Sequence, residues 1–258
     1  MTGWLAAPFH TAAVAEPLSL RRQAPAAPRA KQNSAARISA AVADPSRPDT
    51  DRAKDTARHP AALLALLGLH PGDTVADIWP GEYWDRLFSD VVGPSGKVYA
   101  VHLIEGDKDD KIVTPPAGSR PLSGHANVIT VINPVNAIRL PTKADVIWIR
   151  QNYHDLYAPF MGPADVPAFN KAVFKALKPG GRFVVIDHIA PAGSKIAATE
   201  TTHRIDPDVV KSDMAAAGFR FIGQSDLLRN ANDPHTAYAL DPVIRGHTDQ
   251  FVLIFQRP

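Results

Sequence analysis

The chain has no cysteine among its 258 residues, so it contains no disulfide, no thiolate nucleophile and no cysteine-bound zinc site. It also has little net charge: 28 basic and 26 acidic residues leave a formal charge of +2, too small to indicate a nucleic-acid-binding surface. No apolar run approaches the roughly 18 residues that a membrane-spanning helix needs. Carboxylates, histidines and amides are left to carry any chemistry, and we expect a small-molecule partner, with a homodimer left open.

The first 48 residues differ in composition from the rest of the chain. They are rich in Ala, Pro and Arg without a sustained hydrophobic period, which predicts a disordered arm over residues 1–48. Residues 4–15 end in a small-x-small pattern typical of a secretory cleavage site, but no Lys or Arg precedes them, and Pro8 and His10 interrupt the apolar part. We therefore expect a cytoplasmic protein, with a periplasmic or secreted one as the alternative. Residues 49–258 suffice for one α/β domain with a full core.

Short apolar runs alternate with amphipathic segments along this domain. Alternation of this kind predicts a doubly wound, Rossmann-like α/β sheet, mostly parallel with an antiparallel last strand and with helices on both faces. We expect strands at residues 74–79, 97–102, 127–132, 144–149, 182–187, 219–223 and 249–255, helices at 51–68, 82–92, 166–177 and 207–217, and a loop or broken helix at 105–125.

The stretch from Val75 to Tyr83 joins a buried strand to a helix through a Pro80-Gly81 turn. In an open parallel sheet, ligands bind beyond the carboxyl ends of the strands, and the first strand-to-helix turn usually supplies the closest backbone contact. This turn is therefore the first place to expect a cofactor.

Several short motifs carry a resemblance to one protein family. They are Ala41 to Pro48, Trp79-Pro80-Gly81, Asn152-Tyr153-His154-Asp155, Asp187-His188, His203 to Asp206, and Arg245 to Phe251. Together with the order of elements and the Leu177 to Gly181 turn before a strand, they resemble the class I S-adenosylmethionine (SAM) dependent methyltransferases, and more narrowly a bacterial group of predicted methyltransferases. The resemblance covers most of the chain, and its motifs are specific in combination and weak alone.

The resemblance implies a SAM site at the carboxyl ends of the strands. Asp77 and Gly81 would line the methionine end of the cofactor. Trp79 and Tyr83 stand where the family has glycines, which let a backbone approach the ligand closely. Glu82 and Tyr83 would crowd that approach.

Two further cofactor contacts are implied by the same resemblance. His102 ends the second strand, where the fold usually offers an acid to the ribose hydroxyls, and an imidazole accepts fewer hydrogen bonds than a carboxylate. Asn136 and Ala137, after the third strand, would contact the adenine edge. Two of the three usual SAM contacts are thus altered, and loss of SAM binding is an open alternative.

Two His/Asp pairs follow neighbouring strands of the expected sheet. His154 and Asp155 come after the fourth strand, and Asp187 and His188 close the fifth, so all four should meet in one cleft. A His beside a carboxylate can act as a general base near neutral pH, which makes His154 the first choice for that role and Asp187 or His188 the second. The structural alternative is that His154 caps a turn and Asp187 accepts hydrogen bonds from backbone amides.

These pairs leave more than one function open. They also resemble an oxygen and nitrogen metal shell, but no i, i+4 ligand spacing supports it, and we expect no metal. The leading prediction is SAM-dependent O- or N-methylation of a small molecule with His154 as base. The alternatives are an enzyme of the same fold that has lost methyl transfer and acts as a lyase, isomerase or cyclase, or a non-catalytic ligand-binding protein on a methyltransferase core.

Overall fold

A computed structural model describes residue 1 and residues 27–104, 122–159 and 164–258. The loop predicted at 105–125 lies largely outside these residues. Within them, no helix combines the length and the apolar character needed to cross a membrane.

A seven-stranded sheet with the order β3-β2-β1-β4-β5-β7-β6 forms the centre of the molecule. Strands β1 to β5 pair in parallel, and β7 runs antiparallel between β5 and β6. The strands are β1 (Thr74–Ile78), β2 (Lys97–Ile104), β3 (Val128–Pro134), β4 (Ala144–Arg150), β5 (Leu177–His188), β6 (Arg220–Ser225) and β7 (Gln250–Gln256). The predicted fold class, a mostly parallel doubly wound sheet with an antiparallel last strand, is confirmed.

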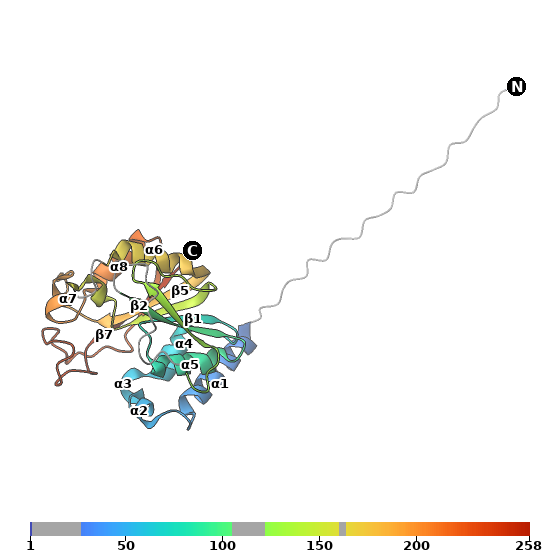
Figure 1. Ribbon diagram of the computed structural model, residues 1–258, viewed down its shortest axis with the longest axis horizontal. Helices are drawn as coiled ribbons and strands as arrows, with labels where there is room; N and C mark the ends of the chain where they lie inside the picture. Colours follow the sequence, from blue (N-terminus) through green and yellow to red (C-terminus); the bar gives the residue numbers. More distant parts are fainter. Residues whose placement is uncertain (2–26, 105–121, 160–163) are drawn as a thin grey trace.

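Helices cover both faces of the sheet (Figure 1). One layer contains α6 (Val166–Ala176) and α8 (Pro207–Ala216), and the other contains α4 (Pro60–Leu67) and α5 (Glu82–Val92). Alternate residues of a strand point to opposite layers because a strand has a side-chain period of two. Thus Ile147 packs with the α6 layer, and its neighbour Trp148 packs with the α5 layer. This two-sided burial explains the continuous apolar runs in the sequence.

The prediction of disorder over residues 1–48 was wrong for residues 27–43, which form helix α1 (Ala27–Ala43). Ile38 and Ala41 lie three residues apart on one face of this helix and are buried in the same core as α4 and α5. Such a narrow apolar stripe is hard to recognise in an Ala-rich sequence, because packing against the domain rather than intrinsic propensity stabilises the helix.

The single helix predicted over residues 51–68 is also wrong, because the structure has three short helices there. They are α2 (Asp49–Arg52), α3 (Asp55–Arg58) and α4. His59 adopts a left-handed conformation with φ of 46°, and Pro60 then begins α4 at its first turn, where a missing N–H costs nothing.

Farther along, the Lys178 to Gly181 segment, predicted as a turn after α6, is part of β5, because Leu177 already pairs with Ala144 of β4.

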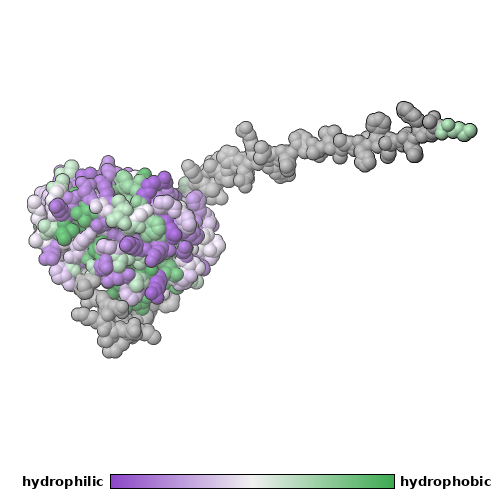
Figure 2. All heavy atoms as spheres, turned by 90° about the horizontal axis from the view of Figure 1, so that it is seen from above, coloured by the Kyte–Doolittle hydropathy of each residue, from purple (hydrophilic) through white to green (hydrophobic). Residues whose placement is uncertain are grey.

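The surface seen in Figure 2 mixes hydrophilic and hydrophobic residues in small groups. Large exposed apolar side chains are found on the edge strand β6, at Phe221 and Ile222, and in the segment before β7, at Tyr238, Leu240 and Val243. The expected homodimer stays a prediction.

Asp85, in the first turn of α5, is a buried acid with an unpartnered oxygen. It is 5 % exposed, its Oδ1 has no hydrogen-bond partner, and burial followed by the charge of Glu82 raises its pKa to about 7, against a smaller lowering by Arg86. The charge of Asp85 in turn raises the pKa of the buried Asp77 of β1.

We expect Asp85→Asn to stabilise the protein at pH 8 by several degrees more than at pH 5. The pKa of Asp85 is higher in the folded protein than in the unfolded chain, so the wild type loses stability as the pH rises from the ordinary value of 3.8 through about 7. The asparagine variant does not lose this stability, because asparagine does not ionise. Thermal melts of both proteins at the two pH values test this. An equal difference in melting temperature at pH 5 and pH 8 would contradict it.

Candidate active site at the carboxyl ends of the strands

A cavity of about 310 Å³ lies at the carboxyl ends of β1, β4 and β5. It is the place where a doubly wound sheet binds its ligand. The lining residues are Arg58, Asp77, Trp79, Gly81, Trp84, Trp148, Arg150, Gln151, Asn152, Asp155, His188, His203 and Leu240.

The two predicted His/Asp pairs meet beside this cavity, as their strand positions indicated. His154 begins the short 3-10 helix η1 (His154–Tyr157) directly after β4, and Asp187 lies near the end of β5. Asp187 accepts hydrogen bonds from the backbone N–H of His154 (2.8 Å) and of His188 (2.8 Å), and its Oδ1 lies 2.8 Å from Nδ1 of His154. A carboxylate only accepts, so Nδ1 of His154 donates to it.

The electrostatics of the cluster differ from those expected of a general base. Burial alone would lower the pKa of His154, but Asp187 and Asp155 together outweigh it and raise the pKa to about 10. Burial lowers the pKa of His188 to about 4. At neutral pH His154 therefore already carries a proton, whereas His188 is neutral and its Nδ1 lies 2.6 Å from Oγ1 of Thr248.

A third histidine, His203, joins the cluster, although in the sequence it stands out only as the start of the His203 to Asp206 motif. Its Nε2 lies 3.6 Å from Oδ1 of Asp155, and its ring is edge-on to that of His154 with centroids 4.4 Å apart. Burial, followed by the charge of His154, lowers its pKa. His203 reaches the cavity because an isolated bridge between Ile189 and Ile205 brings its segment back beside the end of β5.

In the turn after β1, a tryptophan adopts a backbone conformation that favours glycine. Trp79 has a φ of 56°, in the left-handed region that favours glycine, at a position where the resemblance expects one. Gly81 has an extended φ of −130°, and a Cβ there would meet nothing within 4 Å. Gly81 therefore leaves open space at the start of α5 on the cavity side.

Strained backbone gathers at this cavity. Of the six non-glycine residues with positive φ among those described, three line it: Trp79, Gln151 and His203. Such conformations cost of order 1–3 kcal/mol each and cluster at functional sites. This concentration supports the cavity as the functional site.

Tyr83 does not line the cavity, contrary to the expectation that it crowds the cofactor. Its hydroxyl donates to Asp55 over 2.6 Å, and its ring lies 4.4 Å from the guanidinium carbon of Arg58. The reason is its place on α5, which points the side chain toward α3 rather than toward the turn.

The other predicted cofactor residues lie elsewhere. Asn136 and Ala137 line a separate cavity of about 570 Å³ beside α6, where Oδ1 of Asn136 accepts from the backbone N–H of Asp165. His102 is half-buried in β2, pairs in register with Ile132 of β3, and has its pKa lowered by burial. His102 is not among the residues that line the 310 Å³ cavity.

Unpartnered polar atoms are concentrated at the 310 Å³ cavity. Nine buried side-chain polar atoms among the described residues have no hydrogen-bond partner, and four belong to its lining: Nε1 of Trp84, Nε1 of Trp148, Nε of Arg150 and Oδ1 of Asp155. Leaving such an atom unpaired costs about 1–3 kcal/mol. Three of the four are donors, which suits a ligand that brings acceptor atoms.

The described part of the cavity suits the amino-acid end of SAM, the cofactor that this fold implies. This end of the cofactor carries a carboxylate and an ammonium group. The unpartnered donors of Arg150, Trp84 and Trp148 suit the carboxylate. The buried Asp77 suits the ammonium group. Burial, followed by the charge of Asp85, raises the pKa of Asp77, and a bound cation would lower this pKa again. Arg150 was not predicted, because the sequence shows it only as the end of an apolar strand.

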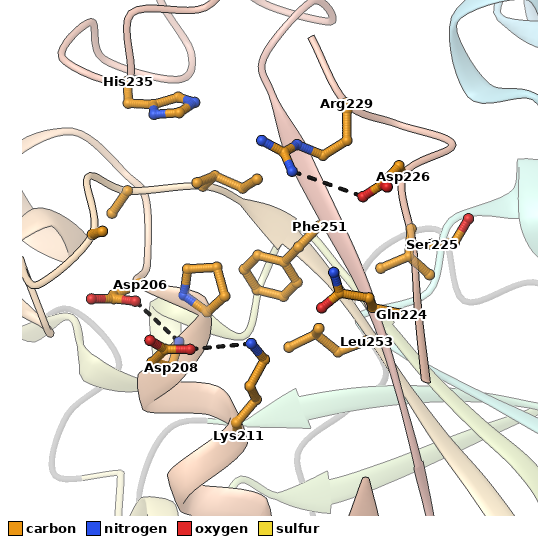
Figure 3. A pocket seen from close by; sticks show the side chains of 15 residues that line it. Asp206, Asp208, Lys211, Gln224, Ser225, Asp226, Arg229, His235, Phe251 and Leu253 are labelled. Carbon is orange, nitrogen blue, oxygen red and sulfur yellow. Dashed lines mark hydrogen bonds and ion pairs between the residues drawn. The ribbon is translucent and has the colours of Figure 1, made fainter. Parts of the chain in front are cut away.

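A larger cavity of about 410 Å³, next to α8, fits a ligand less well (Figure 3). Its charged groups already have partners: Lys211 bonds to Asp208, and both Arg229 and His235 bond to Asp249 over 2.8 Å. Paired groups of this kind stabilise the surrounding segments and leave little for a ligand.

The chain matches no protein-family model. Among solved structures it is similar to a SAM-dependent methyltransferase from Mesorhizobium loti, with 17 % identity, a TM-score of 0.51, and coverage of 79 % of this chain and 100 % of that one. It is also similar to the [4+2]-cyclase SpnF, with 15 % identity, a TM-score of 0.50 and 81 % of each chain covered. The fold is therefore that of the class I SAM-dependent methyltransferases.

Proposed function

We propose that this protein is a SAM-dependent methyltransferase that acts on a small molecule. The observation that carries the proposal is that one cavity is lined both by the turn after β1, with Asp77 and Gly81, and by the His/Asp cluster at the ends of β4 and β5. A cofactor at the turn and an acceptor at the cluster would thus share one cavity.

Each side of the cavity has its role in this proposal. Asp77 and Arg150 hold the amino-acid end of SAM, and Gly81 leaves room for it. The bound cofactor supplies an electrophilic methyl group. Asp155 and His203 reach the cavity beside His154 and position the hydroxyl or amine that accepts the methyl group, because catalysis of this kind depends mainly on alignment. Trp79 and Leu240 add apolar surface for a hydrophobic substrate.

Calorimetric titration of the protein with SAM and with S-adenosylhomocysteine tests the proposal. We expect micromolar binding, equivalent to about 8 kcal/mol. Gly81→Val should weaken it by more than about tenfold, because the new side chain occupies the open space before the turn. Gly223→Val on β6 is the matched control, since a Cβ there also meets nothing within 4 Å, and it should bind SAM like the wild type. Absence of binding by a folded wild-type protein refutes the proposal.

A second function is favoured by Trp79, which replaces a glycine at the cofactor turn and lines the cavity. An enzyme of this fold that has lost methyl transfer would use the His/Asp cluster for cofactor-free acid-base chemistry, as a lyase, isomerase or cyclase. The same core without catalysis would be a ligand-binding protein. The similarity to the cyclase SpnF concerns the fold alone. If the protein is folded but does not bind SAM, the result supports this second function.

A further inference from the structure

We propose that His154, Asp155 and His203 form a binding site for a divalent transition-metal ion at the edge of the cavity. Each side chain offers one nitrogen or oxygen donor atom, and the three donor atoms lie within 4.8 Å of one another. The inference goes beyond the proposed methyl transfer and does not depend on it.

The distances between donor atoms match a metal coordination shell. Nε2 of His154 lies 3.2 Å from Oδ1 of Asp155, and Nε2 of His203 lies 3.6 Å from the same oxygen. Two donors bound to zinc at about 2.0–2.1 Å with tetrahedral angles lie about 3.4 Å apart. A small adjustment of His203, whose side chain is 19 % exposed, would complete the shell.

Two of the three donor atoms are buried without a hydrogen-bond partner. His154 is fully buried and Asp155 is 6 % exposed, and Nε2 of His154 and Oδ1 of Asp155 lie 3.2 Å apart as an ion pair without the geometry of a hydrogen bond. A metal ion coordinated by both atoms would satisfy them.

The outer partners of the site are those that orient metal ligands. Nδ1 of His154 donates to Asp187 over 2.8 Å, which leaves Nε2 as the nitrogen directed to the metal. Oδ2 of Asp155 accepts from Nδ2 of Asn152 over 2.9 Å, and Oδ1 is the oxygen that faces the two imidazoles. A carboxylate behind a ligating histidine is the usual arrangement in metal sites.

His203 is held toward the site by its own backbone. It has a φ of 58°, a conformation that histidine adopts more readily than most residues, and the next residue, Arg204, is fully buried and bonded to Asp233. The ring therefore sits on a fixed segment rather than on a loose loop. Its partial exposure to the cavity leaves a coordination position for water or for a substrate oxygen.

Two imidazoles and one carboxylate select the class of metal. This ligand set suits Zn²⁺, Mn²⁺ and Fe²⁺, whereas Mg²⁺ and Ca²⁺ prefer shells of oxygen alone. If the proposed methyl transfer is correct, a metal at this place would bind the oxygen of the acceptor and favour loss of its proton.

The test is calorimetric titration of the full chain, first stripped with a chelator and then dialysed, with Zn²⁺ and with Mg²⁺. We expect one Zn²⁺ per chain with micromolar or tighter affinity and no comparable binding of Mg²⁺. With Co²⁺ as the probe, visible absorption typical of a four-coordinate ion should appear. SAM is absent from these titrations, so the metal site and the proposed cofactor site succeed or fail independently.

The diagnostic variant is His203→Asn, because asparagine also tolerates a left-handed conformation and the fold should persist, as thermal melting would show. It should weaken Zn²⁺ binding by more than about tenfold. His247→Asn, at an exposed histidine that is not one of the three proposed ligands, is the matched control and should bind like the wild type. Equal Zn²⁺ binding by both variants, or no saturable binding by the folded wild type, overturns the proposal.

Discussion

Arg204→Ala is expected to lower the free energy of unfolding by about 3–5 kcal/mol. Arg204 is fully buried and forms a two-pronged ion pair with Asp233, with distances of 2.8 and 3.0 Å. Its guanidinium also donates to the carbonyl oxygens of Ala237 and Ile189. Without the guanidinium, the carboxylate of Asp233 stays buried without its counter-charge, and an uncompensated buried charge strongly destabilises the folded state.

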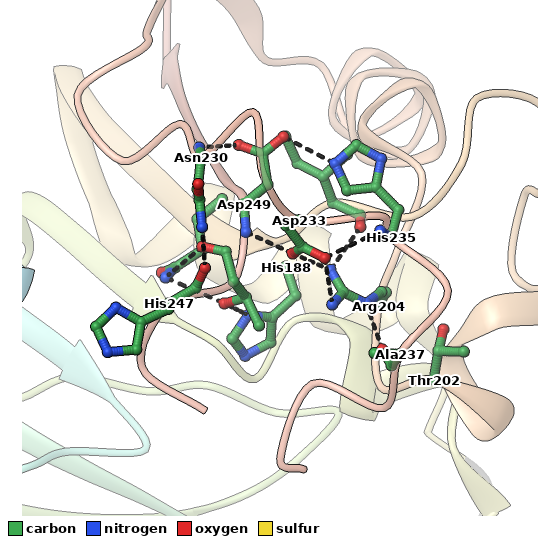
Figure 4. A network of polar contacts seen from close by, with 12 residues as sticks. His188, Thr202, Arg204, Asn230, Asp233, His235, Ala237, His247 and Asp249 are labelled. Atoms are coloured by element: carbon green, nitrogen blue, oxygen red, sulfur yellow. Dashed lines mark hydrogen bonds and ion pairs between the residues drawn. The ribbon is translucent and has the colours of Figure 1, made fainter. Parts of the chain in front are cut away.

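The loss should extend through a larger polar network (Figure 4). Asp233 also accepts from the backbone N–H of Asp249, and Asp249 bonds to His235 over 2.8 Å. These contacts tie the irregular segment before β7 to the end of β5, where the cavity lies.

Urea denaturation monitored by tryptophan fluorescence measures the effect of Arg204→Ala. Arg220→Ala is the control, since Arg220 lies on β6, is exposed and bonds to the side chain of Gln256, so it should cost less than about 0.5 kcal/mol. Similar denaturation midpoints for the two variants would show that the buried ion pair is not needed.

Asp187→Ala is the second substitution with a large expected effect, again about 3–5 kcal/mol of stability. The carboxylate is fully buried and accepts from two backbone N–H groups and from the His154 ring. Burial alone would raise the pKa of Asp187, but His154 lowers it, so the substitution removes a charge that the imidazolium needs. Alanine leaves three buried donors without an acceptor.

Denaturation in the presence of a chelator measures the intrinsic cost of Asp187→Ala. Asp187→Asn keeps the shape but offers one acceptor oxygen, so it should fall between the alanine variant and the wild type. Asp208→Ala, at an exposed acid in the first turn of α8, controls for loss of a charge. If Asp187→Ala costs no more than Asp208→Ala, the carboxylate does not organise the site.

The sheet and the meeting of His154 with Asp187 were predictable because both depend on strand order. Apolar runs locate the strands, and parallel neighbours bring the residues after β4 and β5 to one edge. The N-terminal cap of α8 also follows from local sequence, since Asp206 stands directly before Pro207 and its side chain accepts from the N–H of Asp208.

Contacts that depend on long connections could not be predicted. Nothing in the local sequence indicates that Arg204 is buried, but the segment around Asp233, far along the chain, buries it completely. His203 joins the cluster only because its segment folds back beside β5. The direction of Tyr83 depends on the rotation of α5, which hydrophobic periodicity defines only approximately.

The position of β7 between β5 and β6 has a consequence for synthesis on the ribosome. β6 hydrogen-bonds to β7 alone, so it has no partner in the sheet until residues 250–256 have left the exit tunnel. Until then the nascent chain exposes the apolar edge of β5, with Phe183 and Val185, as a template for wrong pairing. Thr248, which contacts His188, and Gln250, which contacts Gln151, arrive in the same step, so the site forms only when the sheet closes.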